Sequence, residues 1–336
     1  MPLPRNTESL IRQLFDILPM DGIENPEALV KRLTQLQRGL NPEHEFALIL
    51  SWLGRCRLVH RLGQEQLPLD SAATFRVPDL LAVFEYEDRL VPALIEVKTT
   101  DVADPMSLEM GSLPYKKSKY AAYADVVGLP LLLAWRHRGI WSLFDASHGR
   151  IANVNHKIDF ATALKENLLG LLAGDFSYRL TPGTRIRMRL RKLADPDPAT
   201  GQFPATITNV DYVNPSGKVV TDVPQLHSLF MFWKNDVEIE EDGDDIVQSF
   251  VIPDDTIAEL ASRTLARLVN SFSSLRSESI DWHAIVHDTS HFAHQQGELK
   301  QLIALAASHG MASNIWKVIP HTFPSFLSKQ PSTSTF

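Results

Sequence analysis

The sequence lacks several features on which large classes of proteins depend. Its 336 residues contain a single cysteine, Cys56, which excludes an internal disulfide framework and favours a reducing, cytoplasmic location. The longest nearly uninterrupted apolar run, residues 126–135, contains Gly128 and Pro130 and is far shorter than the roughly 20 residues that a membrane helix needs. No Gly-rich phosphate loop with its lysine and hydroxyl residue is found. We therefore expect no membrane partner and no ATP-driven step in this chain.

A strongly basic composition is missing as well. The formal net charge is -7, which argues against indiscriminate coating of nucleic acid but leaves room for a local basic groove. Hydrophobic residues make up 44% of the chain, and its length is sufficient for two domains. Composition thus limits the class of protein without indicating an activity.

Periodicity and turn signals predict a complete α/β unit in the first half of the chain. The expected order is helix, strand, strand, strand, helix, strand, strand, which predicts a mixed sheet flanked by helices. The first helix, "PEHEFALILSWL", ends at Gly54, and the second ends at Gly128. The expected elements are helix 42–53, a strand near 56–62, a hairpin turning at 86–89, helix 115–127 and a hairpin turning at 136–139.

The remainder of the chain has a different residue pattern. Short strand-like runs divided by Pro, Gly and Asp predict a β-rich module, and helical periodicity returns after it. The expected organisation is an N-terminal helical segment (1–40), the α/β core (41–150), a connecting helix (151–175, with its pattern over 157–174), a β-rich module (176–252), a C-terminal helical region (253–325) and a disordered tail (326–336).

Two acids and a lysine face each other across the first predicted hairpin. A turn centred on 87–88 pairs residues whose numbers sum to 175, which places Asp79 opposite Glu96 and pairs Leu81 with Leu94. Because side chains alternate along a strand, Asp79, Glu96 and Lys98 share one face. Like charges at directly opposed positions destabilise a sheet, and a divalent cation between the carboxylates would remove that repulsion. An ordinary hairpin with a charged solvent face is the alternative.

Pro78-Asp79, a gap of one strand and then Glu96-Val97-Lys98 resemble the PD-(D/E)XK nuclease superfamily, which includes restriction endonucleases and archaeal Holliday junction resolvases. The resemblance covers roughly residues 40–145, in element order as well as motif. It implies a restriction-endonuclease-like fold and hydrolysis of phosphodiester bonds, most often in DNA. The implied cofactor is Mg²⁺, for which Mn²⁺ can substitute. Asp79, Glu96 and the Val97 carbonyl would hold the metal, and Lys98 would orient the attacking water.

The resemblance also implies a glutamate on the helix before the first strand and a polar residue on the helix after the third. Glu43 matches the first position better than Glu45, by its distance from Gly54. Either one is equally well explained as an acid in the first turn of a helix. On the second helix, nucleic-acid contacts are expected from Lys116, Lys119 and Tyr120 or Tyr123, of which Lys119 and Tyr123 are spaced to share a helix face. A solvated lysine face over packed tyrosines fits equally well.

Basic residues alternate with apolar ones in "RIRMRLRK". As a strand, this segment presents Arg185, Arg187, Arg189 and Arg191 on one face, a row suited to phosphate backbones. Pairing with the acids that follow in the sequence, or protection of a strand edge, is the slightly favoured alternative. Those acids centre on "EDGDD" at 241–245, which predicts a solvated hairpin turn.

Three functions follow from these patterns. The first is a metal-dependent nuclease acting on nucleic acid, as a homodimer or with a partner subunit, in restriction, phage defence or repair. The second is a binding or assembly protein that does not hydrolyse nucleic acid, and the third is a regulatory subunit. A histidine repeat at His283, His287 and His291 is expected to be structural rather than a metal site.

Overall fold

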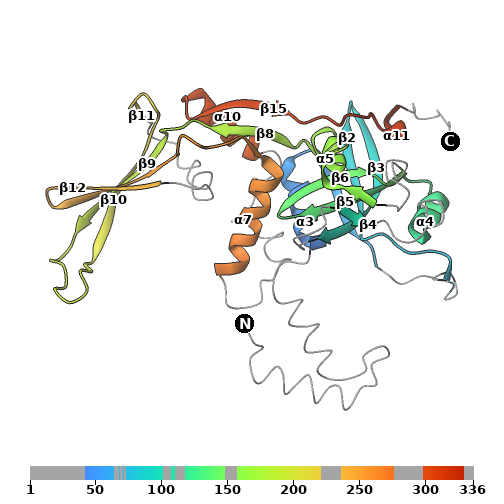
Figure 1. Cartoon of the computed structure of the whole chain (residues 1–336), viewed down its shortest axis with the longest axis horizontal. Helices are drawn as coiled ribbons and strands as arrows, with labels where there is room; N and C mark the ends of the chain where they lie inside the picture. Colours follow the sequence, from blue (N-terminus) through green and yellow to red (C-terminus); the bar gives the residue numbers. More distant parts are fainter. Residues whose placement is uncertain are drawn as a thin grey trace, which may run out of the picture.

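The computed structural model describes most of the chain, drawn as a coloured ribbon in Figure 1. The described residues are 42–63, 68, 71, 73–100, 107–109, 118–147, 157–220, 236–275 and 298–328. Of the expectations above, the helices within 1–40, Lys116 and the histidine repeat lie outside these residues. None of the helices in the described ranges is long and apolar enough to cross a membrane.

A five-stranded mixed sheet forms the first half of the structure, as the order of elements predicts. Its strands run in the order β1-β2-β3-β5-β6; β3 and β5 are parallel, and the other neighbours are antiparallel. Helices α3 and α4 flank it. The elements are α3 (Pro42–Leu53), β1 (Cys56–Arg61), β2 (Leu80–Tyr86), β3 (Arg89–Thr100), α4 (Lys119–Val127), β5 (Leu131–His137) and β6 (Ile140–Asp145).

The β2–β3 hairpin has the expected register. Leu80 pairs with Ile95 and Leu81 with Leu94, in agreement with the sum of 175. Its two turn residues, Glu87 and Asp88, both have positive φ, the conformation that matches the twist of a two-residue hairpin. The predicted register is confirmed, so Asp79, directly before β2, lies opposite Glu96.

The two faces of this sheet pack against different helices. Ile95, Val97, Leu132 and Ala134 belong to one apolar cluster with the buried side of α3. The alternate residues of β3 and β5, such as Leu94 and Leu133, belong to a second cluster with Ala124 of α4. Glu96 and Lys98 therefore lie on the α4 face, because they alternate with Ile95 and Val97.

The expected single helix over 157–174 is divided in the structure. It consists of β7 (Lys157–Asp159), α5 (Phe160–Lys165) and a π-helical turn, η4 (Leu169–Ala173). The Asp159 side chain caps α5 by accepting the Thr162 amide. The Asn167 side chain accepts the amides of Leu143 and Leu169, which replaces helical hydrogen bonding between the two pieces. β7 pairs with β4 (Ser107–Glu109) in a separate sheet.

A second five-stranded sheet projects from the body of the molecule, at the left of Figure 1. Its order is β11-β10-β9-β13-β12, so the arginine-rich strand β9 is central rather than at an edge. The acidic strand β12 and β13 pair up to Asp242 and Asp245, which confirms the hairpin turn at "EDGDD". The strands are β9 (Arg185–Lys192), β10 (Ala205–Val213), β11 (Val219–Val220), β12 (Asp236–Asp242) and β13 (Asp245–Val251).

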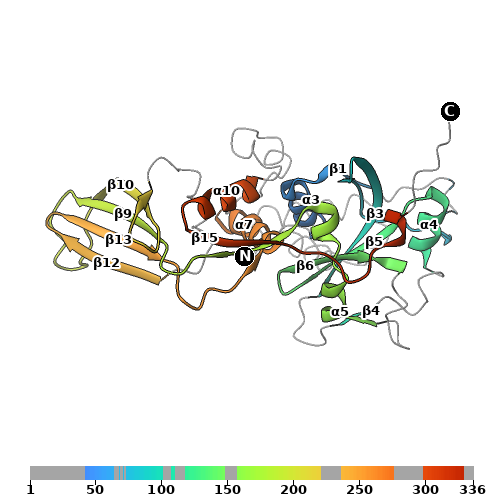
Figure 2. The ribbon, with the colours of Figure 1, turned by 90° about the horizontal axis from the view of Figure 1, so that it is seen from above.

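The last part of the chain returns to the first sheet. Helices α7 (Ala261–Leu275) and α10 (Glu298–Ser308) pack beside α3, and their buried residues join its apolar cluster. The view from above in Figure 2 shows β15 running beside α7 and α10. Strands occur where only helix was expected: β14 (Glu259–Leu260) and β15 (Ala312–Lys317) both pair with β8 (Phe176–Leu180).

The beginning of the expected disordered tail is ordered. It lies in α11 (Ser325–Ser328), where Leu327 is buried and Arg89 of β3 donates a hydrogen bond to the Leu327 carbonyl oxygen. Phe323 lies 6.1 Å from Tyr86, measured between ring centroids. These contacts explain the difference from the expectation, because they connect the polar C-terminal segment to the core hairpin.

Candidate functional site

The carboxylates of Asp79 and Glu96 come together where β2 begins beside β3. Asp79 stands one residue before β2, and its Oδ2 accepts the backbone amide of Val97 at 2.7 Å. This hydrogen bond fixes the Asp79 carboxylate against the strand that carries Glu96. Glu96 is only 2% exposed and Asp79 is partly buried, which differs from an ordinary hairpin with a charged solvent face.

The electrostatics of the pair are unfavourable for two anions. Burial, followed by the negative charge of Glu96, raises the pKa of Asp79 to about 6, although the Val97 amide and Lys98 lower it. Within the described part of the chain, the buried Oε2 atom of Glu96 has no hydrogen-bond partner. A buried carboxylate oxygen without a donor is costly, and a bound cation or a substrate proton would remove that cost.

A lysine and an aromatic ring lie beside the Glu96 carboxylate. The Lys98 ammonium forms an ion pair with Oε1 of Glu96 and lies 5.5 Å from the centre of the Tyr120 ring. Burial raises the pKa of Tyr120 well above its ordinary value, and the nearby Glu96 carboxylate adds to the increase. Of the two tyrosines that α4 offers, it is thus Tyr120 that lies beside Glu96. The guanidinium of Arg76, a residue absent from the sequence-based expectations, also lies over this ring.

The residues present fit a small divalent cation with oxygen ligands. Asp79, Glu96 and the Val97 carbonyl offer oxygen only, and Mg²⁺ is commonly held by one or two carboxylates while it retains several waters. The unpartnered Oε2 of Glu96 is the observation that favours this fit. Within the described ranges, no group of three or more His, Cys, Asp or Glu side chains comes together as a metal site. Any ion here would thus keep water in most of its coordination positions.

The two candidate glutamates of α3 have different surroundings. Glu43 forms an ion pair with Arg61 at 3.2 Å, at the end of β1. Glu45 is fully buried; its Oε2 accepts Arg136 at 2.5 Å and its Oε1 accepts the Trp141 indole at 2.8 Å. Both belong to the α3 side, whereas Asp79 and Glu96 lie on the α4 face. Glu45 therefore joins α3 to β5 and β6, and Glu43 stays a prediction as a catalytic acid.

The other two candidate residues of α4 in the described chain are Lys119 and Tyr123. Lys119 is exposed at the first turn, and its carbonyl oxygen accepts the Arg76 amide at 3.2 Å. Tyr123 is partly buried and packs on the cluster of Leu133 and Trp135. Packing accounts for Tyr123 without a ligand, and its role in nucleic-acid binding stays a prediction, as does that of Lys119.

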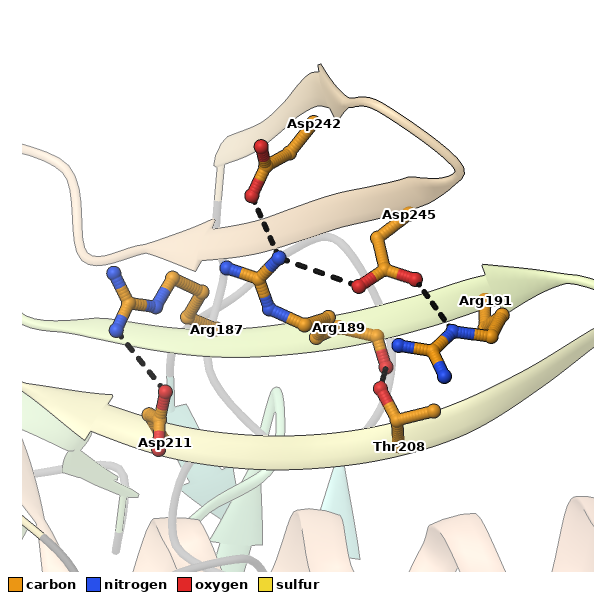
Figure 3. Close-up of polar contacts among 7 residues, drawn as sticks. All are labelled: Arg187, Arg189, Arg191, Thr208, Asp211, Asp242 and Asp245. Atoms are coloured by element: carbon orange, nitrogen blue, oxygen red, sulfur yellow. Dashed lines mark hydrogen bonds and ion pairs between the residues drawn. The ribbon is translucent and has the colours of Figure 1, made fainter.

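The arginine row of β9 is paired with acids along its length, as the close-up in Figure 3 shows for three of its members. Arg187 contacts Asp211 of β10 at 3.0 Å, and Arg191 contacts Asp245 of β13 at 3.0 Å. Arg189 reaches Asp242 at 2.6 Å and Asp245 at 3.4 Å. Arg185 pairs with Glu238, and Lys192 with Glu241. A phosphate backbone would have to compete with these carboxylates, so binding by Arg185, Arg187 and Arg189 stays a prediction.

Comparison with known proteins adds a similarity to solved structures. No protein-family model matches the chain, and no curated protein matches it. Among solved structures, it is similar to Hjc of Archaeoglobus fulgidus, described as a Holliday junction resolvase from an archaeal hyperthermophile. The TM-score is 0.26 and the identity 19%, over 36% of this chain and 87% of that one. Similarity at this level supports no conclusion about function, which has to come from the geometry of the site.

Proposed function

We propose that this protein is a Mg²⁺-dependent phosphodiesterase that cleaves nucleic acid, with DNA as the expected substrate and Mn²⁺ as an effective substitute. The observation that carries the proposal is the pair formed by Asp79 and Glu96, with a buried Glu96 oxygen that no described residue satisfies. A structural hairpin gains nothing from such an oxygen. A site for a cation and a phosphoryl group uses it.

The residues around the pair have separable roles. A bound Mg²⁺ would supply an activated water and neutralise charge on the phosphoryl oxygens. Asp79 and Glu96, with the Val97 carbonyl, would hold it, and the Val97 amide keeps the Asp79 carboxylate in position. Lys98 orients the attacking water and stabilises the charge that develops in the transition state. Its ion pair with Glu96 holds the ammonium beside the carboxylate that would bind the metal.

Cleavage of labelled substrates tests the proposal. We expect cutting of single-stranded, duplex or branched DNA, or of RNA, that needs Mg²⁺ and stops in EDTA. Lys98→Ala should lower the rate at least 10³-fold, because one preorganised group that stabilises transition-state charge contributes about 10²–10³ and positioning of the water adds to it. Binding of Mn²⁺ should raise the melting temperature of the protein. This increase should also be seen in Lys98→Ala, because Lys98 is not a metal ligand.

Arg57→Ala is the matched control for this experiment. Arg57 is an exposed cation on β1 that pairs with Glu85, away from the carboxylate pair, and its loss should leave the rate unchanged. Binding of nucleic acid without any cutting, at all metal concentrations, would instead support a binding or assembly protein. If neither binding nor cutting occurs, a regulatory subunit is the better description.

A further inference from the structure

Arg76 lies outside the acid-acid-lysine motif, but its guanidinium lies over the ring of Tyr120, which neighbours Glu96 and Lys98. It precedes Asp79 by three residues, in the segment that leads into β2. Its backbone amide donates to the carbonyl oxygen of Lys119 at 3.2 Å, which connects this segment to the first turn of α4. The backbone of Arg76 is thereby held between the two elements that carry Asp79 and Tyr120.

The side chain of Arg76 is held by an aromatic ring. Its guanidinium carbon lies 5.0 Å from the centre of the Tyr120 ring, and the Lys98 ammonium lies 5.5 Å from the same centre. Stacking on a ring orients a guanidinium through its face and leaves the N–H groups at its edge available. Tyr120 thus holds two cations over one ring next to Glu96.

The Arg76 guanidinium differs from the arginines of β9 in that it has no acidic partner within the described residues. It is exposed, and within the described residues no carboxylate forms an ion pair with it. The arginines of β9 each contact an acid, and Arg136 contacts Glu45. An oriented guanidinium with its donors available is suited to bidentate contact with a phosphate.

We propose that Arg76 binds a phosphate of the nucleic-acid backbone beside the Asp79–Glu96 pair, and that Tyr120 is the positioning residue that holds its guanidinium in place. The proposal rests on the proposed function and adds to it a substrate contact. Successive phosphates along one strand are about 3.4 Å apart along a duplex axis, so two cations over a single ring can serve neighbouring phosphates. Arg76 would hold the phosphate next to the one that Lys98 faces.

Binding can be measured without cutting in a Lys98→Ala background. A fluorescently labelled duplex is titrated in Mg²⁺ over a series of salt concentrations, and anisotropy gives the dissociation constant. Adding Arg76→Ala should weaken binding roughly tenfold and lower the slope of log affinity against log salt by about 1, because one phosphate contact is lost. Arg76→Lys should recover part of the affinity, since the charge returns without the planar fork. Arg57→Ala in the same background is the control and should change neither quantity.

Variants of Tyr120 test its positioning role. Tyr120→Phe keeps the ring and should retain the salt slope. Tyr120→Ala should weaken binding, because the Arg76 guanidinium loses the ring that holds it. The double variant Arg76→Ala/Tyr120→Ala should then bind about as well as Arg76→Ala alone, a coupling that two independent residues would not give. The rise in melting temperature with Mn²⁺ should stay unchanged in Arg76→Ala, which separates loss of a phosphate contact from loss of the metal site.

The outcomes distinguish this inference from the proposed function. If the unmodified protein cuts DNA but Arg76→Ala leaves affinity and salt slope unchanged, the inference is wrong and the nuclease proposal stands. If the protein binds without cutting and Arg76→Ala still lowers the slope, hydrolysis is wrong and the phosphate contact stands. Absence of any binding to duplex, single-stranded or branched substrates would overturn both.

Discussion

The charged residues of the two five-stranded sheets differ in how they are paired. On the projecting sheet, every basic residue of β9 has an acidic partner on a neighbouring strand or one strand further away. On the first sheet, Asp79 and Glu96 face each other, one lysine pairs with Glu96, and a buried Glu96 oxygen lacks a donor in the described chain. Both regions appear as dense charge in the sequence. Of these two regions, only the first sheet has a buried carboxylate oxygen without a partner in the described residues, and a ligand could bind there.

The comparison shows that the number of charges is a poor guide to a site and that their compensation is a better one. A row of arginines becomes part of a sheet when acids occupy the facing positions, as Asp211 and Asp245 do. A buried acid that keeps an unpaired oxygen is destabilising unless something else binds it.

The largest effect should come from Glu96→Gln, which removes a charge from the pair while keeping its shape. We expect cutting to fall at least 10³-fold and the Mn²⁺-induced rise in melting temperature to disappear, since the metal loses one of its two carboxylates. Thermal unfolding with and without Mn²⁺ and a cleavage assay measure the two effects. Glu85→Gln, on the same hairpin but paired with Arg57, is the control. Equal metal stabilisation of both variants would show that Glu96 is no ligand.

Much of the first sheet and its site could be predicted from the sequence, because the signals there are local. The turn at Glu87 and Asp88 sets the register, and the register alone places Asp79 opposite Glu96. Gly54 and Gly128 mark the C-terminal ends of α3 and α4. Alternation then assigned Glu96 and Lys98 to one face.

The parts that could not be predicted depend on contacts between distant segments. Arg76 and Tyr120 meet only because α4 packs beside the start of β2. The break within 157–174 comes from the Asn167 side chain bonding to β6, and β15 forms because β8 offers it an edge. The partners of the β9 arginines lie up to 56 residues away in the sequence. No pattern within one segment carries that information.

The next largest effect should be on stability, in Glu45→Ala. Glu45 is a buried acid like Glu96, but Arg136 and Trp141 satisfy both of its oxygens. Removing it takes the fully buried carboxylate away from the Arg136 guanidinium and the Trp141 indole, and breaking such a pair typically costs about 3–5 kcal/mol. Urea denaturation measures this loss, and the folded variant should still cut.

Glu43→Ala, whose ion pair is partly exposed, should cost about 0–1 kcal/mol. Cutting lost in Glu43→Ala alone would establish Glu43 as the additional catalytic acid.

A smaller, pH-dependent effect is expected at Asp175, a third buried acid. Burial raises its pKa to about 6, although Ser262 and the Phe176 amide donate hydrogen bonds to the carboxylate and oppose the increase. The folded state therefore keeps the proton that the unfolded state releases near pH 4. As pH rises from about 4 to 7, wild type should lose roughly 2–3 kcal/mol of unfolding free energy relative to Asp175→Asn, and the difference should level off above about pH 7. Denaturation curves at several pH values test this, and a constant difference between the two proteins would contradict the assignment.

The smallest effect should come from the arginine row itself, and it is the sharpest test of the contrast between the two sheets. In the Lys98→Ala background, Arg187→Ala/Arg189→Ala should change duplex affinity less than about twofold and leave the salt slope unaltered, because both guanidinium groups already contact acids. Anisotropy titrations measure both quantities beside the Arg76→Ala variant. A slope lowered by about 2 would mean that phosphates displace Asp211 and Asp242. The projecting sheet would then be a nucleic-acid platform, as its sequence taken alone suggests, and compensation of charge would no longer separate the two regions.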